Sequence, residues 1–321
     1  LEGKAEISLA GVGKIASDRI HIWLEEFSDS ANQATNQASK NKLTPVRILA
    51  SGDVLLDTVE LRANTQRAEV WLRKKIPAAG NSTTSPAPSL PTNNENATGQ
   101  TGLKYVVQGD LIQIQLAQKD GKHILQEALI KDKLVLRQVS SSPGGRSPFV
   151  LHGNSVSLKR DLAGLFEMTL TGDSDRGQPA WIAFEEFQIS GNQISLNQRQ
   201  NLMWIKGAGE IAFSPRDTVT TTQTRRISWQ EQMAFDGSQI ELFGNVKTRG
   251  QFTTDEETTF DLTLDCGVLR GYLTKRVDFS SPEQKNPAEL YMLSCGNAVA
   301  ISNRVLDANK LQQAFHQMQA N

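Results

Sequence analysis

The sequence predicts an all-β fold, an elongated stack of short antiparallel strands, and three observations support this prediction. First, a short phrase recurs in which Gly adjoins Asn, Ser or Asp and apolar residues follow. Gly, Asn and Asp tolerate a positive φ, so each copy predicts a turn and then the start of a strand. Second, the segments around these copies alternate apolar and polar residues, as strands with one buried face do. Third, only 38% of the residues are hydrophobic, which suits a thin β structure in which half of each strand faces water.

The repetition favours an open stack of β units over a closed barrel or a sandwich, because stacked units reuse one local pattern. The six copies of the phrase are Ser51-Gly52-Asp53-Val54, Gln108-Gly109-Asp110-Leu111, His152-Gly153-Asn154-Ser155-Val156, Ser190-Gly191-Asn192-Gln193-Ile194, Asp236-Gly237-Ser238-Gln239-Ile240 and Cys295-Gly296-Asn297-Ala298-Val299.

The N-terminal part of the chain contains two similar strand blocks. Residues 1–24 alternate around a Gly-Val-Gly turn, the polar residues 28–42 predict a loop, and residues 46–76 form the second block. Residues 77–101 are rich in Ser, Thr, Asn and Pro and have almost no large apolar residue, so we expect a disordered insertion between strands. A linker between two domains is the alternative interpretation.

Strand patterns continue from residue 104 to residue 301, with Gly-Asn and Asp-Gly turn signals between them. We therefore expect a β-stack over residues 1–305, built either as one continuous stack or as two copies at about 1–160 and 161–305. Residues 306–321 predict a short C-terminal helix, since Leu311, Ala314, Phe315 and Met318 share one helical face.

The charge balance argues against a nucleic acid or an anionic membrane surface as partner. The chain has 34 basic and 35 acidic residues, so no strong field attracts such partners. It contains no apolar run long enough for a transmembrane helix. The sequence begins at Leu1 and enters a strand pattern at once, so we expect a processed or excised piece, and the missing signal peptide does not argue for the cytoplasm.

No catalytic grouping in the sequence outweighs a simple structural explanation. Asp261 and Asp265 share one side of a strand, as a glycosidase pair would, but they alternate with apolar residues and so resemble a polar strand face in water. No GxSxG motif or complete glycine-rich phosphate loop is present. We therefore expect a protein that is not an enzyme and that has no metal or cofactor.

Apolar and aromatic residues stand out in the second half of the chain. They either fill the core of the stack or line an open apolar groove, and such a groove would suit acyl chains because it needs few polar anchors. The candidate ligand-binding residues of this inner face are Ile194, Leu196, Trp204, Phe213, Met233, Phe235, Ile240 and Leu242.

The chain has two cysteines, Cys266 and Cys295, and neither belongs to a CxxC motif. They form either one disulfide between neighbouring strands or two buried thiols, and the sequence leaves both interpretations open.

Several of these strand motifs resemble those of a known family. Phe243-Gly244-Asn245-Val246-Lys247-Thr248, the segments 189–196 and 233–242, Gly3-Lys4-Ala5-Glu6-Ile7 and the segment 15–20 resemble repeats of the OstA-like (organic solvent tolerance) proteins, the periplasmic bridge proteins of lipopolysaccharide transport. Trp204-Ile205-Lys206-Gly207-Ala208-Gly209 followed by Trp229-Gln230 is similar to the larger, planctomycete-type versions.

The resemblance implies a twisted, V-shaped stack of two antiparallel sheets with an apolar interior for acyl chains. It also implies open ends that add strands to neighbouring proteins, and no catalytic residues.

We expect a non-catalytic periplasmic or cell-envelope module that binds or conducts lipid, namely lipopolysaccharide or a related amphiphile. The expected partners are this amphiphile, other envelope proteins bound by strand-edge pairing, and further copies of the chain, but no nucleic acid. One alternative is a structural or assembly module of the envelope that pairs edge to edge without a ligand. A second alternative is a carbohydrate-active β-helix built around Asp261 and Asp265.

Overall fold

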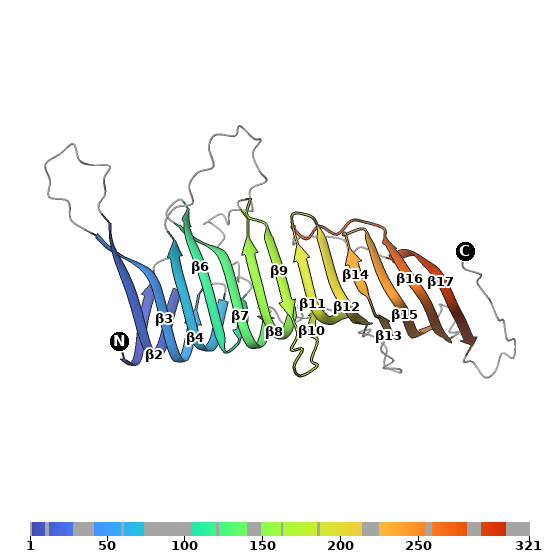
Figure 1. The fold of residues 1–321 in the computed structure, drawn as a ribbon, viewed down its shortest axis with the longest axis horizontal. Coiled ribbons are helices and arrows are strands. Elements are labelled where there is room, and N and C mark those ends of the chain that lie inside the picture. Colours follow the sequence, from blue (N-terminus) through green and yellow to red (C-terminus); the bar gives the residue numbers. More distant parts are fainter. Residues whose placement is uncertain are drawn as a thin grey trace, which may run out of the picture. The chain divides into compact units, whose positions relative to one another are not determined.

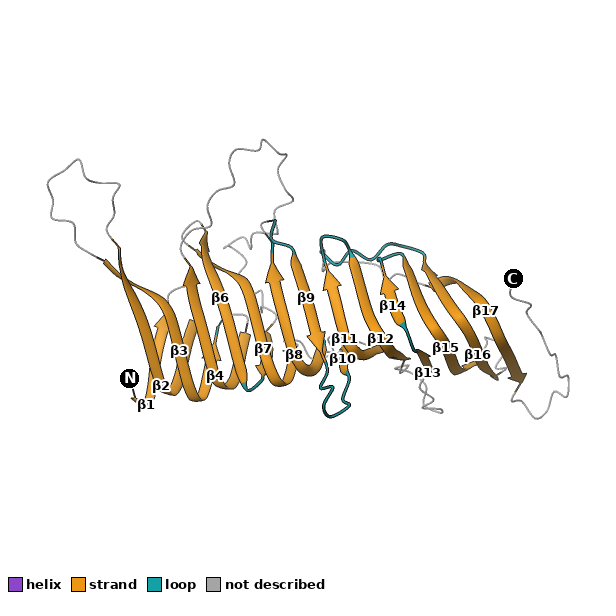
Figure 2. Cartoon of the chain, in the orientation of Figure 1, coloured by secondary structure: helices purple, strands orange, loops and turns teal. Residues whose placement is uncertain are grey.

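The described part of the chain consists of strands and short connections. The structure is a computed structural model, and it describes residues 2–9, 13–27, 42–58, 61–73, 104–119, 122–139, 149–161, 163–184, 187–213, 225–253, 259–280 and 290–305. These residues form seventeen strands and no helix, which confirms the predicted all-β class (Figure 2). Most of the predicted loop at 28–42, the insertion at 77–101 and the helical tail at 306–321 lie outside the described residues.

The chain divides into two compact units, and Figure 1 labels most of their strands. The first comprises Leu1–Gly145 and Val156–Gly164, and the second comprises Arg146–Ser155 and Leu165–Asn321. Strand β8 (Val150–Arg160) contributes residues to both units. Whether the two units are copies of one ancestral repeat stays a prediction.

The first unit is a mixed β ladder. Its strands are β1 (Glu2–Leu9), β2 (Gly13–Phe27), β3 (Lys42–Asp57), β4 (Leu61–Arg73), β5 (Lys104–Gln108), β6 (Leu111–Lys119) and β7 (Lys122–Val139). Strands β1 to β4 pair as successive antiparallel neighbours, but β4 pairs in parallel with both β5 and β6. This corrects the expectation of antiparallel pairing throughout. Parallel neighbours need a long connection, and residues 74–103 supply it between β4 and β5.

The second unit is antiparallel in every described strand pair. Besides the start of β8, its strands are β9 (Phe166–Thr171), β10 (Ala180–Phe184), β11 (Phe187–Asn197), β12 (Leu202–Phe213), β13 (Arg225–Trp229), β14 (Gln232–Phe235), β15 (Gln239–Thr253), β16 (Thr259–Leu273) and β17 (Leu290–Val305).

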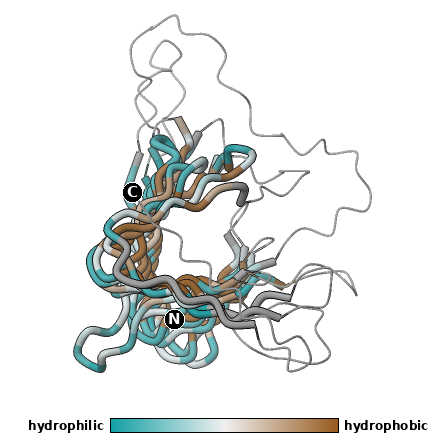
Figure 3. The backbone as a smooth tube through the Cα atoms, turned by 90° about the vertical axis from the view of Figure 1, so that its right-hand side faces the viewer, coloured by the Kyte–Doolittle hydropathy of each residue, from teal (hydrophilic) through white to brown (hydrophobic). Residues whose placement is uncertain are grey.

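The long strands of the second unit change partners midway, which gives the unit two arms. Arm A consists of β9, β14 and the strand segments that pair with them. Arm B consists of β10, β13 and the strand segments that pair with them. Strand β12, for example, pairs with β14 through Met203–Lys206 and with β13 through Gly209–Phe213. Viewed end-on, the strands are bent and the apolar residues lie mainly on the inner side of the bends (Figure 3).

The repeated Gly phrase marks these bends more often than it marks turns. Four of the six copies lie inside strands β3, β8, β11 and β17, and Gly244-Asn245 lies inside β15. At Ser51/Val54, Gly191/Gln193 and Phe243/Val246 the pairing register shifts, which identifies β-bulges. The prediction of a turn at every copy was therefore wrong, because a bulge bends a strand without ending its ladder.

We expect Gly244→Ala to lower the free energy of unfolding by about 1–2 kcal/mol, because Gly244 has a φ of +79° and a side chain is strained there. Its Cβ would also lie 2.3 Å from Cγ of Glu231, although that exposed side chain can move. Urea unfolding measures the effect. The control is Gly296→Ala, which has no positive φ and a nearest heavy atom at 3.9 Å, so it should change stability by at most about 0.5 kcal/mol.

Candidate functional site

Arm A of the second unit carries a continuous apolar row that is fully buried. The strand register aligns its members directly across neighbouring strands, from β9 through β11, β12, β14 and β15 to β16. Every member is at most 3% exposed, so the row is filled core and has little surface left for a ligand. We call it the buried row, and it consists of Leu170, Ile194, Ile205, Met233, Leu242 and Leu269.

A second apolar row lies two residues further along the same strands. Side chains two apart on a strand point to the same face, so this row borders the buried row on the apolar face. Its members are half-buried, and none is charged. We call it the rim row, and it consists of Met168, Leu196, Met203, Phe235 and Ile240. The rim row is the part of this face that a ligand can reach.

The structure divides the eight predicted ligand-binding residues among several places. Ile194, Met233 and Leu242 belong to the buried row, and Leu196, Phe235 and Ile240 belong to the rim row. The other two residues lie apart from these rows.

Phe213 lies at the end of β12 in arm B, 37% exposed, with its ring centroid 6.4 Å from that of Phe187. Trp204 pairs with Ala234, whereas its neighbour Met203 pairs with Phe235. Because successive residues of a strand face opposite sides, Trp204 lies on the face opposite the rim row.

A short segment after β16 covers part of the rim row. We call residues 274–280 the strap. The ring of Phe279 packs edge-on against that of Phe235, with centroids 5.6 Å apart. The N–H of Val277 donates to the carbonyl of Gly237 at 2.7 Å. The strap thus reaches the turn between β14 and β15 and shields one end of the rim row from water.

The side chain of Asn201 anchors the strap. Its Nδ2 donates to the carbonyls of Asp236 and Val277 at 2.9 and 2.8 Å, and its Oδ1 accepts from the N–H of Phe279 at 2.8 Å. Gln198 adds a bond from Nε2 to the Phe279 carbonyl at 2.8 Å. This anchor could not be predicted from the sequence, because the residues around Asn201 do not indicate a contact with a segment more than 70 residues away.

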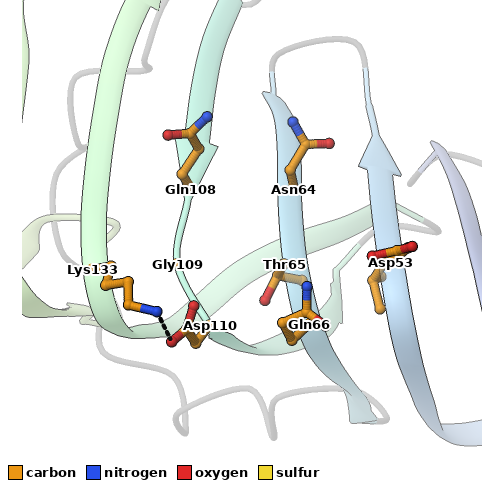
Figure 4. Close-up of a pocket in the computed structure, with 9 residues that line it drawn as sticks. Asp53, Asn64, Thr65, Gln66, Gln108, Gly109, Asp110 and Lys133 are labelled. Atoms are coloured by element: carbon orange, nitrogen blue, oxygen red, sulfur yellow. Dashed lines mark ion pairs between the residues drawn. The ribbon is translucent and has the colours of Figure 1, made fainter.

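The bends of the strands carry polar hollows of a different character. In the first unit a hollow of about 480 Å³ is lined mostly by carboxylates, amides and hydroxyls (Figure 4). Asp110 forms an ion pair there with Lys133 at 3.2 Å. The second unit has a hollow of about 510 Å³ at its own bend, next to Gly191, Asn192 and Asn245. Such linings hydrogen-bond water or polyols and do not suit an acyl chain.

The buried carboxylate of the first unit, Glu69, is neutralised by its neighbours. Its side chain is 5% exposed and accepts from Arg67 Nε at 2.9 Å, while Arg47 lies 3.5 Å away. The Arg47 guanidinium in turn lies over the ring of Trp23, 4.7 Å from its centroid. The two guanidinium groups thus compensate the charge of the buried carboxylate, although Arg47 Nε has no hydrogen-bond partner among the described residues.

The suggested glycosidase pair gains no support from the geometry. Asp265 lies 3.9 Å from Lys247 in an ion pair across β15 and β16, and the side chain of Asp261 lies outside the described residues. No group of three metal-binding side chains occurs among the described residues. The described part of the chain also contains no helix that is long and apolar enough to cross a membrane.

The two cysteines lie close together on adjacent strands as free thiols, with Cys266 buried and Cys295 half-buried.

Comparison with protein-family models, curated proteins and solved structures finds no match for this chain. The resemblance to the OstA-like family therefore stays an expectation.

Proposed function

We propose that the chain is a non-catalytic lipid-binding or lipid-conducting bridge module of the cell envelope, with lipopolysaccharide or a related amphiphile as ligand. The observation that carries this proposal is the rim row, five uncharged apolar side chains aligned across β9, β11, β12, β14 and β15. The periplasmic location and the kind of lipid follow from the motif resemblance, and the apolar face supports lipid binding itself.

The dimensions of the rim row suit one extended acyl chain. Four strand-to-strand spacings of about 4.8 Å give the row a length of roughly 19 Å. Covering about 200 Å² of apolar surface would contribute about 5 kcal/mol of binding free energy. Two of its five members are methionines, whose flexible side chains adapt to ligands of different shape. The buried row lies beside it on the same face and packs the sheet rigidly there.

Photo-crosslinking from two adjacent residues tests this proposal. A benzophenone side chain at position 203 lies within the rim row, and the same group at position 204 points to the opposite face of the sheet. With lipopolysaccharide micelles as the probe, we expect crosslinks from position 203 and few or none from position 204. Equal crosslinking from both positions, or none from position 203 in a folded protein, would contradict the proposal.

Substitutions in the rim row provide the second test. A carboxylate at Phe235 or Ile240 would be buried against the acyl chain, so Phe235→Asp and Ile240→Asp should weaken lipid binding at least about tenfold. Trp204→Asp is the matched control and should leave binding unchanged. Circular dichroism shows whether each variant remains folded. Two different rim positions are used because Phe235 also contacts the strap.

A structural or assembly module is the second candidate, and the sheet edges favour it. Among the described strands β17 pairs only with β16, and Leu293 on β17 is 56% exposed. In the first unit residues 22–27 of β2 have β3 as their single partner among the described strands, and Leu24 there is 52% exposed. Unpaired edges with apolar side chains recruit strands from other chains. Concentration-dependent oligomers that disappear in Leu293→Lys, without any bound lipid, would favour this candidate over the first.

The β-helix alternative loses its support from the fold. A parallel β-helix requires parallel ladders, whereas all described pairs of the second unit, including those of β16, are antiparallel.

A further inference from the structure

The two cysteines lie at the bend of the last two described strands. Cys266 on β16 is 1% exposed, and Cys295 on β17 is half-buried. Both are free, and the two thiols lie close enough to interact electrostatically. The chain has two cysteines in total, so this is the single cysteine pairing that can form within it.

The bend explains why these side chains meet although they are not direct partners. Cys266 pairs with Ala298, and Cys295 pairs with Leu269, so the cysteines are offset by three positions on adjacent strands. Cys266 and Leu269 are both buried, so the usual alternation of faces breaks between them, where Asn297 has a positive φ of 54° and lies beside Gly267. A bent ladder brings residues from the two sides of the bend together on its concave face.

The surroundings give the two sulfur atoms different roles. Burial, followed by the interaction with Cys295, raises the pKa of Cys266 to about 12, so this thiol ionises less readily than an ordinary cysteine and is suited to the second, intramolecular attack. Its Sγ also donates to the carbonyl of Val268 at 3.4 Å. Cys295 is the more exposed thiol, and a reagent from solution reaches it first.

We propose that Cys266 and Cys295 form a thiol–disulfide pair which, when oxidised, covalently fastens the edge strand β17 to β16. The oxidant is a disulfide, either a small molecule or the active site of a disulfide oxidase. The Cys295 sulfur attacks one sulfur of the oxidant, breaks its S–S bond and releases one thiol. The Cys266 sulfur then attacks this mixed disulfide at Cys295 and releases the second thiol. The two protons of the cysteines end on the two released thiols, and two electrons pass to the oxidant.

The position of the pair gives the bond a structural consequence. Among the described strands β17 has β16 as its single neighbour, so its other edge is free and the strand can fray. A disulfide at the bend closes the chain between residues 266 and 295 and holds both arms of β17 in register. The proposal does not depend on lipid binding, and it is tested on the lipid-free chain.

The experiment uses oxidised glutathione on the purified full chain, followed by intact-mass analysis without reductant. We expect the wild type to lose about 2 Da and to carry no lasting glutathione, because the second thiol resolves the adduct. Cys266→Ser should keep glutathione on Cys295, since it lacks the resolving thiol. Cys295→Ser should react several-fold more slowly, because only the buried thiol is left.

The same samples provide a structural readout. Limited proteolysis of β17 should be several-fold slower for the oxidised wild type than for the reduced wild type or for either serine variant. A wild-type chain that accumulates glutathione on Cys295, or that keeps two alkylatable thiols without a loss of mass, would overturn the proposal.

Discussion

Replacing Asn201 with leucine is expected to lower the free energy of unfolding of the second unit by about 3 kcal/mol or more. Asn201 is 9% exposed and has as many side-chain heavy atoms as leucine, so the substitution removes hydrogen bonds without opening a cavity. It leaves the N–H of Phe279 and the carbonyl of Val277 without this partner. Each buried polar group that loses its partner costs about 1–3 kcal/mol.

The consequence should reach beyond stability, because Asn201 holds the strap against the rim row. Once the strap is released, the contact between Phe279 and Phe235 weakens and the rim row becomes more accessible. Urea unfolding measures the stability, and hydrogen exchange at residues 277–279 measures the release. Asn192→Leu is the control, since Asn192 is exposed and lies at a bend. If both variants were equally stable and their straps equally protected, the amide of Asn201 would not be the anchor.

Strand positions could be predicted from this sequence because alternation is a local property. The blocks around residues 1–24, 46–76 and 104–301 all contain the expected strands. The meaning of the Gly phrases could not be predicted in the same way, since a positive φ is equally compatible with a turn and with a bulge. The phrase at 236–239 is a turn, whereas Gly244-Asn245 bends a continuous strand. Only the pairing partners distinguish the two cases.

Parallel pairing of β4 with β5 and β6 was also beyond reach of the sequence. Hairpin signals predict antiparallel neighbours, and the segment between β4 and β5 has no pattern that indicates where the chain returns.

The candidate site could be predicted only as a set of apolar strands. Residues 202–205 are all apolar, so periodicity does not show which of them share a face with Phe235. The register decides that Met203 does and that Trp204 does not. Phe279 had no detectable signal, because its contact with Phe235 depends on the path of the strap and not on a strand pattern.

The second large effect is expected where Gly191 meets the buried row. A Cβ at Gly191 would lie 2.4 Å from Cγ2 of Ile205, which is fully buried and has no room to move. Gly191→Ala should therefore cost about 2 kcal/mol through overpacking. Ile205→Ala should cost about 3–4 kcal/mol, since it removes buried contacts and leaves a cavity. Both values come from urea unfolding, and Gly296→Ala, which meets no close neighbour, is the control.

The double variant distinguishes steric overlap from a general intolerance of Gly191 to substitution. In the Ile205→Ala background the colliding methyl group is absent, and the added Cβ at position 191 occupies part of the cavity. We therefore expect the double variant to lose about 1–2 kcal/mol less stability than the sum of the two single losses. Strict additivity would mean that position 191 requires glycine for its backbone alone. Non-additivity would show that position 191 is glycine so that the buried row can pack closely against the backbone at the bend.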